Sequence, residues 1–294
     1  MGAMKPDQPY NKRIAVKLQS AEISFYRGTT TLTPIIYVAT ADLNFSIKGK
    51  NTLQVKLPYQ AVDGRLAKTQ GMGDISLCFT RNVYSSDKFS LNLSFGGKIP
   101  TNRSDKTVKA PTGEDERWPL PMYYQTSLGT YDLISGISLI NRKWLIATGI
   151  QVPLNHNNNQ FTWSRWAEAE SGLRAYVNEY NQARELKRGT DVMLRIERNF
   201  RFSKLNLSAG ILPIYRITRD QFIKSGTDED SPLVKVKPVE AHGLACSLIA
   251  TAGYNFDVRS GVRLLVGHKI VQRKTNPDGL TRELVSSITY IYRF

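Results

Sequence analysis

The chain has 294 residues, of which 41% are hydrophobic, and its 40 basic and 25 acidic residues give a formal net charge of +15. No segment approaches 18 consecutive apolar residues, which excludes a transmembrane helix. The lysines and arginines are dispersed and match no nucleic-acid-binding motif, so we expect no nucleic-acid partner. A transmembrane β-barrel is compatible with this composition, because its strands are apolar only at every second position.

Residues 1–12 are expected to form an N-terminal tail. Met1-Gly2-Ala3-Met4 is typical of a remnant of cloning, and we expect that an export signal has been removed. Residues 13–294 are expected to form one β-barrel domain, because strand-like patterns continue to the last residue.

Apolar and polar residues alternate with a period of two through most of this region. From Phe89 to Phe95, every second residue is apolar and the residues between them are serine or asparagine. This period predicts strands with one apolar and one polar face. A change of phase near Ser20 predicts a β-bulge in the first strand. We expect about twelve antiparallel strands, at residues 13–26, 32–47, 51–58, 73–84, 88–99, 125–139, 143–154, 190–202, 204–219, 238–256, 260–273 and 281–294.

The connections between these strands are alternately short and long. The short turns are at residues 48–50, 85–87, 140–142, 203 and 257–259. The connections on the other side are at residues 27–31, 59–72, 100–124, 155–189, 220–237 and 274–280, and most of them are long. Short periplasmic turns and long outer loops are typical of a bacterial outer-membrane barrel. A soluble β-sandwich or periplasmic barrel is the alternative fold.

The C-terminus supports the membrane interpretation. Ile288, Tyr290, Tyr292 and Phe294 form an apolar face that continues to the last residue, whereas the ends of soluble domains are usually polar and frayed. A barrel needs such a strand to close its sheet and to present one face to lipid. We therefore expect a multi-pass barrel in the bacterial outer membrane.

Several short motifs carry a family resemblance. They are Val55-Lys56-Leu57-Pro58-Tyr59, Gly71-Met72-Gly73-Asp74-Ile75-Ser76-Leu77, Gly96-Gly97-Lys98-Ile99-Pro100-Thr101, Asn276-Pro277-Asp278-Gly279-Leu280-Thr281-Arg282 and the closing Tyr292-Arg293-Phe294. Together they resemble the outer-membrane transporter family named for the meta-pathway of phenol degradation. Asn102 departs from the family, which usually has glycine there. The resemblance implies a barrel related to channels for fatty acids and aromatic hydrocarbons.

Polar residues on the strands predict the lining of the lumen. Their side chains should face inward, opposite the apolar lipid-facing residues, and form either a solute path or a salt-bridged filling. The predicted lumen residues are Gln54, Lys56, Asp74, Ser76, Asn92, Lys98, Asp132, Arg195, Glu197 and Arg201.

Two other features are candidates for solute handling. Pro213 interrupts a strand and predicts a kink, which would either open a lateral exit or be a harmless bulge. In the loop 155–189, apolar residues at helical spacing predict a surface helix of about fifteen residues. The loop aromatics Phe161, Trp163 and Trp166 are the candidate site for capturing hydrophobic solutes.

The favoured function is passive uptake of small hydrophobic or aromatic molecules, with no catalytic, metal or cofactor site. One alternative is a closed barrel with a structural or partner-binding role in a surface complex. The other is an outer-membrane lipid hydrolase, for which His242 beside Glu240 is the pair to test. Expected partners are outer-membrane lipid, lipopolysaccharide, whose phosphates suit the positive charge, and the solute.

Overall fold

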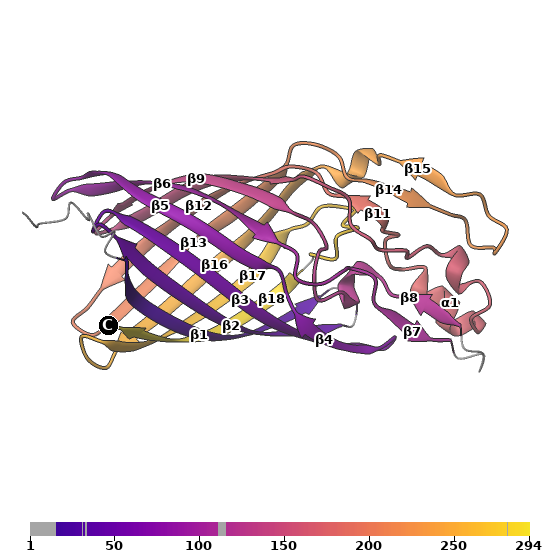
Figure 1. The fold of residues 1–294 in the computed structure, drawn as a ribbon, viewed down its shortest axis with the longest axis horizontal. Coiled ribbons are helices and arrows are strands. Elements are labelled where there is room, and N and C mark those ends of the chain that lie inside the picture. The colour runs from indigo at the N-terminus through magenta and orange to yellow at the C-terminus, as the bar shows by residue number, and fades with distance from the viewer. Residues whose placement is uncertain (1–15, 31, 33, 111–115, 281) are drawn as a thin grey trace, which may run out of the picture.

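The computed structural model describes residues 16–30, 32, 34–110, 116–280 and 282–294, so the predicted tail 1–12 lies outside the described residues. Twelve antiparallel strands form the barrel, and pairing of β2 with β3 closes the sheet (Figure 1). No helix among the described residues is long and apolar enough to cross a membrane. The barrel strands are β1 (Val16–Thr30), β2 (Ile35–Ile47), β3 (Asn51–Asp63), β5 (Ile75–Ser85), β6 (Phe89–Ile99), β9 (Asp132–Asn141), β10 (Trp144–Pro153), β12 (Asp191–Arg201), β13 (Leu205–Arg216), β16 (Gly243–Asn255), β17 (Ser260–Val271) and β18 (Arg282–Arg293).

Each barrel strand separates an apolar outer face from a polar inner face. On β1, Ile23 and Phe25 are more than half exposed, and on β6 Leu93 and Phe95 are also exposed. In water such a continuous apolar surface would be unfavourable, whereas in a bilayer it is matched by lipid. The predicted all-β class and transmembrane barrel are therefore confirmed, and the soluble sandwich is not the fold.

The short turns and the C-terminus lie at one end of the barrel (Figure 1). Exposed aromatic residues lie beside these turns. Ring pairs Tyr84–Phe89, Tyr254–Phe256 and Tyr292–Phe294 have centroids 5.2, 5.6 and 5.0 Å apart. Aromatic rings prefer the boundary between lipid tails and headgroups, so these residues mark one membrane interface.

The long loops gather at the opposite end and contain further structure (Figure 1). β11, β14 and β15 form a three-stranded sheet, β7 and β8 form a hairpin, and β4 pairs with the outer half of β3. The loop elements are β4 (Lys68–Met72), β7 (Thr107–Lys109), β8 (Arg117–Pro119), η1 (Met122–Tyr124), η2 (Ser164–Trp166), α1 (Ser171–Val177), β11 (Arg184–Lys187), β14 (Gln221–Lys224), β15 (Val234–Val236) and η3 (Val239–Ala241).

A buried apolar core holds these loops together. Ile36 and Val62, from the inner faces of β2 and β3, pack in one cluster with Leu120 and Tyr124 from the loop between β6 and β9 and with Val177 from α1. The barrel rim and the loops therefore share one core, which explains why long connections adopt a defined structure.

A short helix in the loop 155–189 is confirmed, but its predicted length of about fifteen residues is wrong. Ser171–Val177 is a helix of only seven residues, preceded by the separate turn Ser164–Trp166. The apolar residues at helical spacing are instead buried in the loop core from turns as well as from the helix. Tertiary packing, not helix amphipathicity, explains their pattern.

Three predicted strand boundaries differ most from the structure. The strand expected at 51–58 continues through Pro58 to Asp63, because β4 supplies a partner for its outer half. The strand expected at 125–139 begins only at Asp132, because Gln125 is hydrogen-bonded into the loops. The strand expected at 238–256 begins at Gly243.

The β-bulge predicted near Ser20 is confirmed. The register between β1 and β2 shifts between Leu18 and Ser20. Beyond this bulge, β1 pairs with β18, and the N–H of Phe294 donates a hydrogen bond to the carbonyl of Gln19 at 3.1 Å. The apolar C-terminal strand therefore closes the barrel, as its pattern predicts.

A charge on the lipid face should destabilise the barrel. Phe25, which is 60% exposed on the outer face near the middle of β1, is changed to arginine. The free energy of unfolding from lipid vesicles, measured by urea titration, should fall by about 2–4 kcal/mol. Ser24→Arg, on the inner face of the same strand, is the control and should lower the free energy of unfolding by a smaller amount. Equal losses would contradict the assignment of faces.

Candidate functional site

A row of polar side chains crosses the inner wall through neighbouring strands. Asp42, Lys56, Ser76, Lys98 and Asp132 are successive register partners on β2, β3, β5, β6 and β9. Side chains at paired positions point to the same side of a sheet, so these five face the lumen together. Nζ of Lys56 lies 3.6 Å from Oδ2 of Asp42. Four of the five are residues that the sequence predicts to line the lumen.

The row continues to the rim beneath the loops. Gln151 on β10 donates a hydrogen bond to Asp132, and its register partner on β12 is Asp191. Asp132 also pairs with Arg188, which precedes β12 and is buried. The row passes from Asp132 to Gln151 through the hydrogen bond between them, because the register partner of Asp132 on β10 is Pro153. Since the strands tilt, the row rises along the barrel from the middle of β2 to the last residue of β13, Arg216.

At the rim, Arg216 joins three segments that are far apart in the sequence. It donates five hydrogen bonds of 2.7–2.8 Å to Asp191, Asp220 and Asp278. Arg216, Asp220 and Asp278 are completely buried, and Arg273 approaches Asp191 at 3.4 Å. A buried guanidinium with all its partners in place holds the loops before β14 and β18 onto the barrel.

The carboxyl groups of this rim cluster differ in acidity. Burial raises the pKa of Asp220 to about 6; Arg216 opposes this rise and the charge of Asp278 adds to it. Burial also acts against ionisation of Asp278, but Arg216, Arg273 and Arg188 together hold the pKa of Asp278 well below its usual range. The cluster therefore has one carboxyl that takes up a proton close to neutral pH and one that stays ionised.

Three of the sequence motifs, at residues 55–59, 71–77 and 96–101, meet at one point on the rim. The N–H of Gly73 donates to the carbonyl of Pro58 at 2.8 Å, and the Thr101 hydroxyl donates to the carbonyl of Gly73 at 2.5 Å. A Cβ on Gly73 would lie 3.1 Å from Cγ of Pro58, which is a tight contact. Asp74 accepts hydrogen bonds from the Ser127 hydroxyl and the Leu128 N–H. Asp74 thus anchors a loop to the rim, and its role in a solute path stays a prediction.

Four of the remaining predicted lumen residues form further contacts on the inner wall. Gln54 donates to Asp42 at 2.8 Å and extends the inner row. Asn92 accepts from Asn82 at 2.9 Å on the neighbouring strand. Arg195 pairs with Glu197, which also accepts a hydrogen bond from Ser208 at 3.1 Å.

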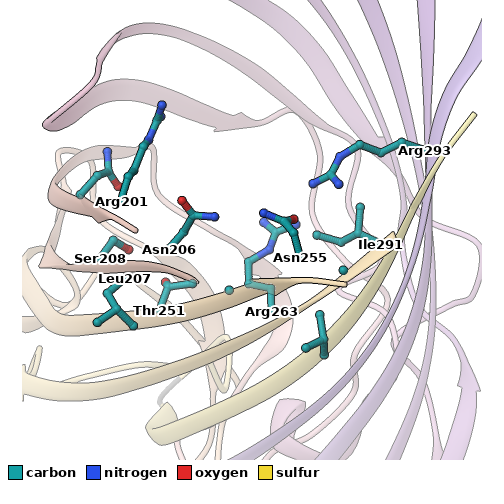
Figure 2. A pocket seen from close by; sticks show the side chains of 13 residues that line it. Arg201, Asn206, Leu207, Ser208, Thr251, Asn255, Arg263, Ile291 and Arg293 are labelled. Atoms are coloured by element: carbon teal, nitrogen blue, oxygen red, sulfur yellow. The ribbon is translucent and has the colours of Figure 1, made fainter. Parts of the chain in front are cut away.

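Arg201 lines a cavity of about 460 Å³ at the short-turn end of the barrel (Figure 2). The cavity is formed by β12, β13, β16, β17 and β18, and its wall also includes Arg263 and Arg293. The ten predicted lumen residues thus lie in five places: the inner row, the contact of Asn92 with Asn82, the pair of Arg195 with Glu197, the rim, and this cavity.

The aromatic residues expected to capture solutes are mostly buried. Phe161 and Trp166 are 0% and 1% exposed, and both belong to the loop core. The indole N–H of Trp163 donates to the carbonyl of Tyr180 at 3.0 Å, and that of Trp166 to the carbonyl of Pro119 at 2.8 Å. In this conformation Phe161 and Trp166 stabilise the loops and are not accessible to a solute, contrary to their expected role.

Pro213 produces a gap in the β12–β13 ladder and no bulge. Pairing of β12 with β13 is absent at Leu212 and Pro213, yet the register is the same on both sides of the gap. Pairing of β13 with β16 continues through Pro213 and Cys246. Proline has no N–H to donate, which accounts for the gap. The prediction of a harmless bulge is therefore wrong, whereas a lateral exit at Pro213 stays a prediction.

The pair considered for hydrolysis is not assembled as a catalytic unit. The ring Nδ1 of His242 contacts the carbonyl of Val239, and Glu240 lies 3.6 Å from Lys274 at the surface. Hydrolysis would need a nucleophile oriented by the histidine. The observed contacts instead fit a turn at the start of β16.

Several residues of the site are missing from the sequence prediction. Asp42, Asp191 and Arg216 lie on the inner faces of their strands, and extending the alternation already used for Glu197 would have found Asp191. Asp220 and Asp278 lie in loops, where no periodic pattern indicates the direction of a side chain. Only the tertiary structure brings them together.

Comparison with known proteins supports the fold. No protein-family profile and no curated protein sequence matches the chain. An outer-membrane channel from Pseudomonas putida F1 matches with a TM-score of 0.62 and 11% identity, over 99% of this chain and 100% of that one. The NanC porin matches with a TM-score of 0.50 and 5% identity, over 94% and 100%. Outer membrane phospholipase A from Escherichia coli reaches only 0.42, with 8% identity over 95% and 99%, and carries no argument for an enzyme.

At these identities the likeness establishes the fold alone. The chain is a β-barrel of the bacterial outer-membrane type. The relationship to the phenol-degradation transporter family stays a prediction that depends on the short motifs.

Breaking the rim cluster should release the loops. Arg216→Met leaves the buried carboxylates of Asp220 and Asp278 without this cation, which should lower the free energy of unfolding by about 3–5 kcal/mol and expose the loops to protease. Arg219→Met, at an exposed position three residues later, is the control. Unchanged protease resistance in the Arg216 variant would exclude the proposed anchoring role.

The raised pKa of Asp220 predicts a pH dependence. A folded-state pKa above the unfolded value means that the folded loops bind the proton more tightly, so their stability should increase from pH 7 to pH 5. Below pH 4 it should decrease, because Asp278 is stabilising only when ionised. Hydrogen exchange of the Gly189 amide, which is bonded to Asp220, measures both changes. Asp220→Asn should abolish the increase between pH 7 and pH 5.

Proposed function

We propose that the protein is an outer-membrane channel for the passive passage of small solutes. The observation that carries this proposal is the polar, accessible inner wall. Lys56, Arg195 and Arg263 face the lumen from three strands, and their side chains are 46%, 37% and 42% exposed. Charged side chains that filled a closed barrel would be largely excluded from water, as Arg216 is at the rim.

The match to the Pseudomonas putida outer-membrane channel supports the same proposal, since it extends over almost the whole of both chains. Transport of hydrophobic or aromatic molecules is the finer form of the proposal and depends on the family resemblance. The described lumen offers charged and amide groups, which favour hydrated solutes. An aromatic solute that used Phe161 or Trp166 would require the loop core to open.

The loop core favours one second candidate, a barrel closed at its outer end with a structural role. The cluster that includes Tyr124, Phe161 and Trp166 is dry, and Ile36 and Val62 extend it into the rim. A protein that never conducts would retain this core in all conditions. In a channel, by contrast, the solute must pass beside the loop core or displace it.

Single-channel recording in a planar bilayer tests the proposal. We expect steady conductance in potassium chloride, and a reduction by phenol would support the aromatic form. Ser76→Trp, between Lys56 and Lys98 on the inner wall, should lower the conductance by narrowing the lumen. Leu77→Trp, at the neighbouring lipid-facing position, is the control and should leave it unchanged. Insertion without any conductance would contradict the channel and favour the closed barrel.

A further inference from the structure

The cavity at the short-turn end has a positively charged wall. Arg201, Arg263 and Arg293 reach it from β12, β17 and β18, and no aspartate or glutamate is among the residues that line it. Figure 2 shows the three arginines on separate strands around the same hollow. These three strands belong to a run of five consecutive strands in the sheet order, from β12 to β18, and the curvature of the barrel wall turns their inner faces toward the same space.

Only one of these arginines has an acidic partner in the part of the chain that the structure describes. Nη2 of Arg263 lies 2.8 Å from Oε2 of Glu22. The guanidinium groups of Arg201 and Arg293 form no ion pair among the described residues. Two positive charges at the wall are therefore not balanced by an acidic side chain of the described residues, and the surrounding barrel strengthens their field.

The rest of the wall supplies neutral hydrogen-bonding groups. Asn199, Asn206 and Asn255 contribute amides, each of which can both donate and accept. The Thr251 hydroxyl is buried and has no hydrogen-bond partner among the described residues, although Thr251 lines the cavity. A buried hydroxyl without a partner costs free energy, which a bound polar group would recover.

We propose that this cavity is a binding site for a small hydroxylated carboxylate. Guanidinium groups recognise carboxylates through paired, charge-assisted hydrogen bonds, and the amides and the hydroxyl suit the hydroxyl groups of such a solute. The volume of about 460 Å³ is that of a small-molecule site. The site deepens the proposed channel function and rests on it only for how the solute reaches the lumen.

The site also predicts ion selectivity. Arg201 and Arg293 lie at the end of the lumen, so every permeating ion passes their field before leaving or after entering. Anions should be concentrated there and cations depleted. A channel with these two arginines at the end of its lumen should therefore be more permeable to chloride than to potassium.

Calorimetric titration of the folded protein in detergent with sodium gluconate tests the binding site directly. Glucose, which has similar hydroxyl groups but no charge, is the matched neutral solute. We expect gluconate to bind and glucose to bind much more weakly. The double variant R201Q/R293Q should weaken gluconate binding by at least about tenfold, since it removes two charged hydrogen-bonding groups. Absence of gluconate binding to the wild-type protein would overturn the proposal.

Arg198→Gln is the matched control variant. Arg198 is on the same strand as Arg201 but on the lipid face, where its guanidinium lies 5.0 Å from the ring centroid of Trp144. This variant should keep wild-type gluconate binding. If Arg198→Gln weakened gluconate binding as much as R201Q/R293Q does, the proposed site would be overturned, because the effect would then come from the total charge of the protein and not from the cavity.

Reversal potentials in a potassium chloride gradient separate this proposal from the channel function. Conductance with anion preference that is lost in R201Q/R293Q would support both. Conductance with no anion preference and no gluconate binding would overturn the site and leave the channel intact. Gluconate binding by a protein that does not conduct would overturn the channel function and support the site.

Discussion

Closure of the backbone hydrogen bonds is the constraint on which the rest of the structure depends. Inside a bilayer no water is available for unpaired N–H and carbonyl groups, so a membrane-spanning sheet must have no free edge. Here β18 pairs with both β17 and β1, and β3 pairs with β2, so that the first and last strands become neighbours. Glu22 on β1 can reach Arg263 on β17 only because of this closure.

Closure also determines where charge can be placed. The outer face is in contact with lipid, so the strands carry nearly all their ionisable groups on the inner face or near the ends. Register then decides which charges meet. Lys98 lies opposite Asp132, and Asp191 lies opposite Arg216, because their strands pair in one register and in no other. A shift by one residue would bring these side chains into lipid.

The two ends of the lumen use charge differently. At the rim, Arg216, Asp220 and Asp278 are buried and join the loops to the barrel, so their charge stabilises structure. At the short-turn end, Arg201 and Arg293 have no acidic partner among the described residues and face an open cavity. The same residue type thus holds the loops at one end and is available to a solute at the other.

The amino-acid sequence by itself determined the class of fold, because alternation with period two is a local property. The outward faces of Phe95 and Tyr290, the bulge near Ser20 and the short turns follow directly from neighbouring residues. The inward direction of Lys56, Ser76 and Lys98 follows in the same way, and the structure brings these three together. The boundaries of strands next to loops, such as Asp132 and Gly243, do not follow, since partners from distant segments decide them.

Only the tertiary structure decided the contacts that join distant segments. The loop between β17 and β18 supplies Asp278 to Arg216, and the loop core buries Phe161 and Trp166, which look like exposed aromatics in the sequence. The cavity around Arg201 needs five strands at their closed-barrel positions. The physical reason is that periodicity gives the face of each residue, whereas the partners across the lumen depend on register, tilt and loop packing, which no local pattern encodes.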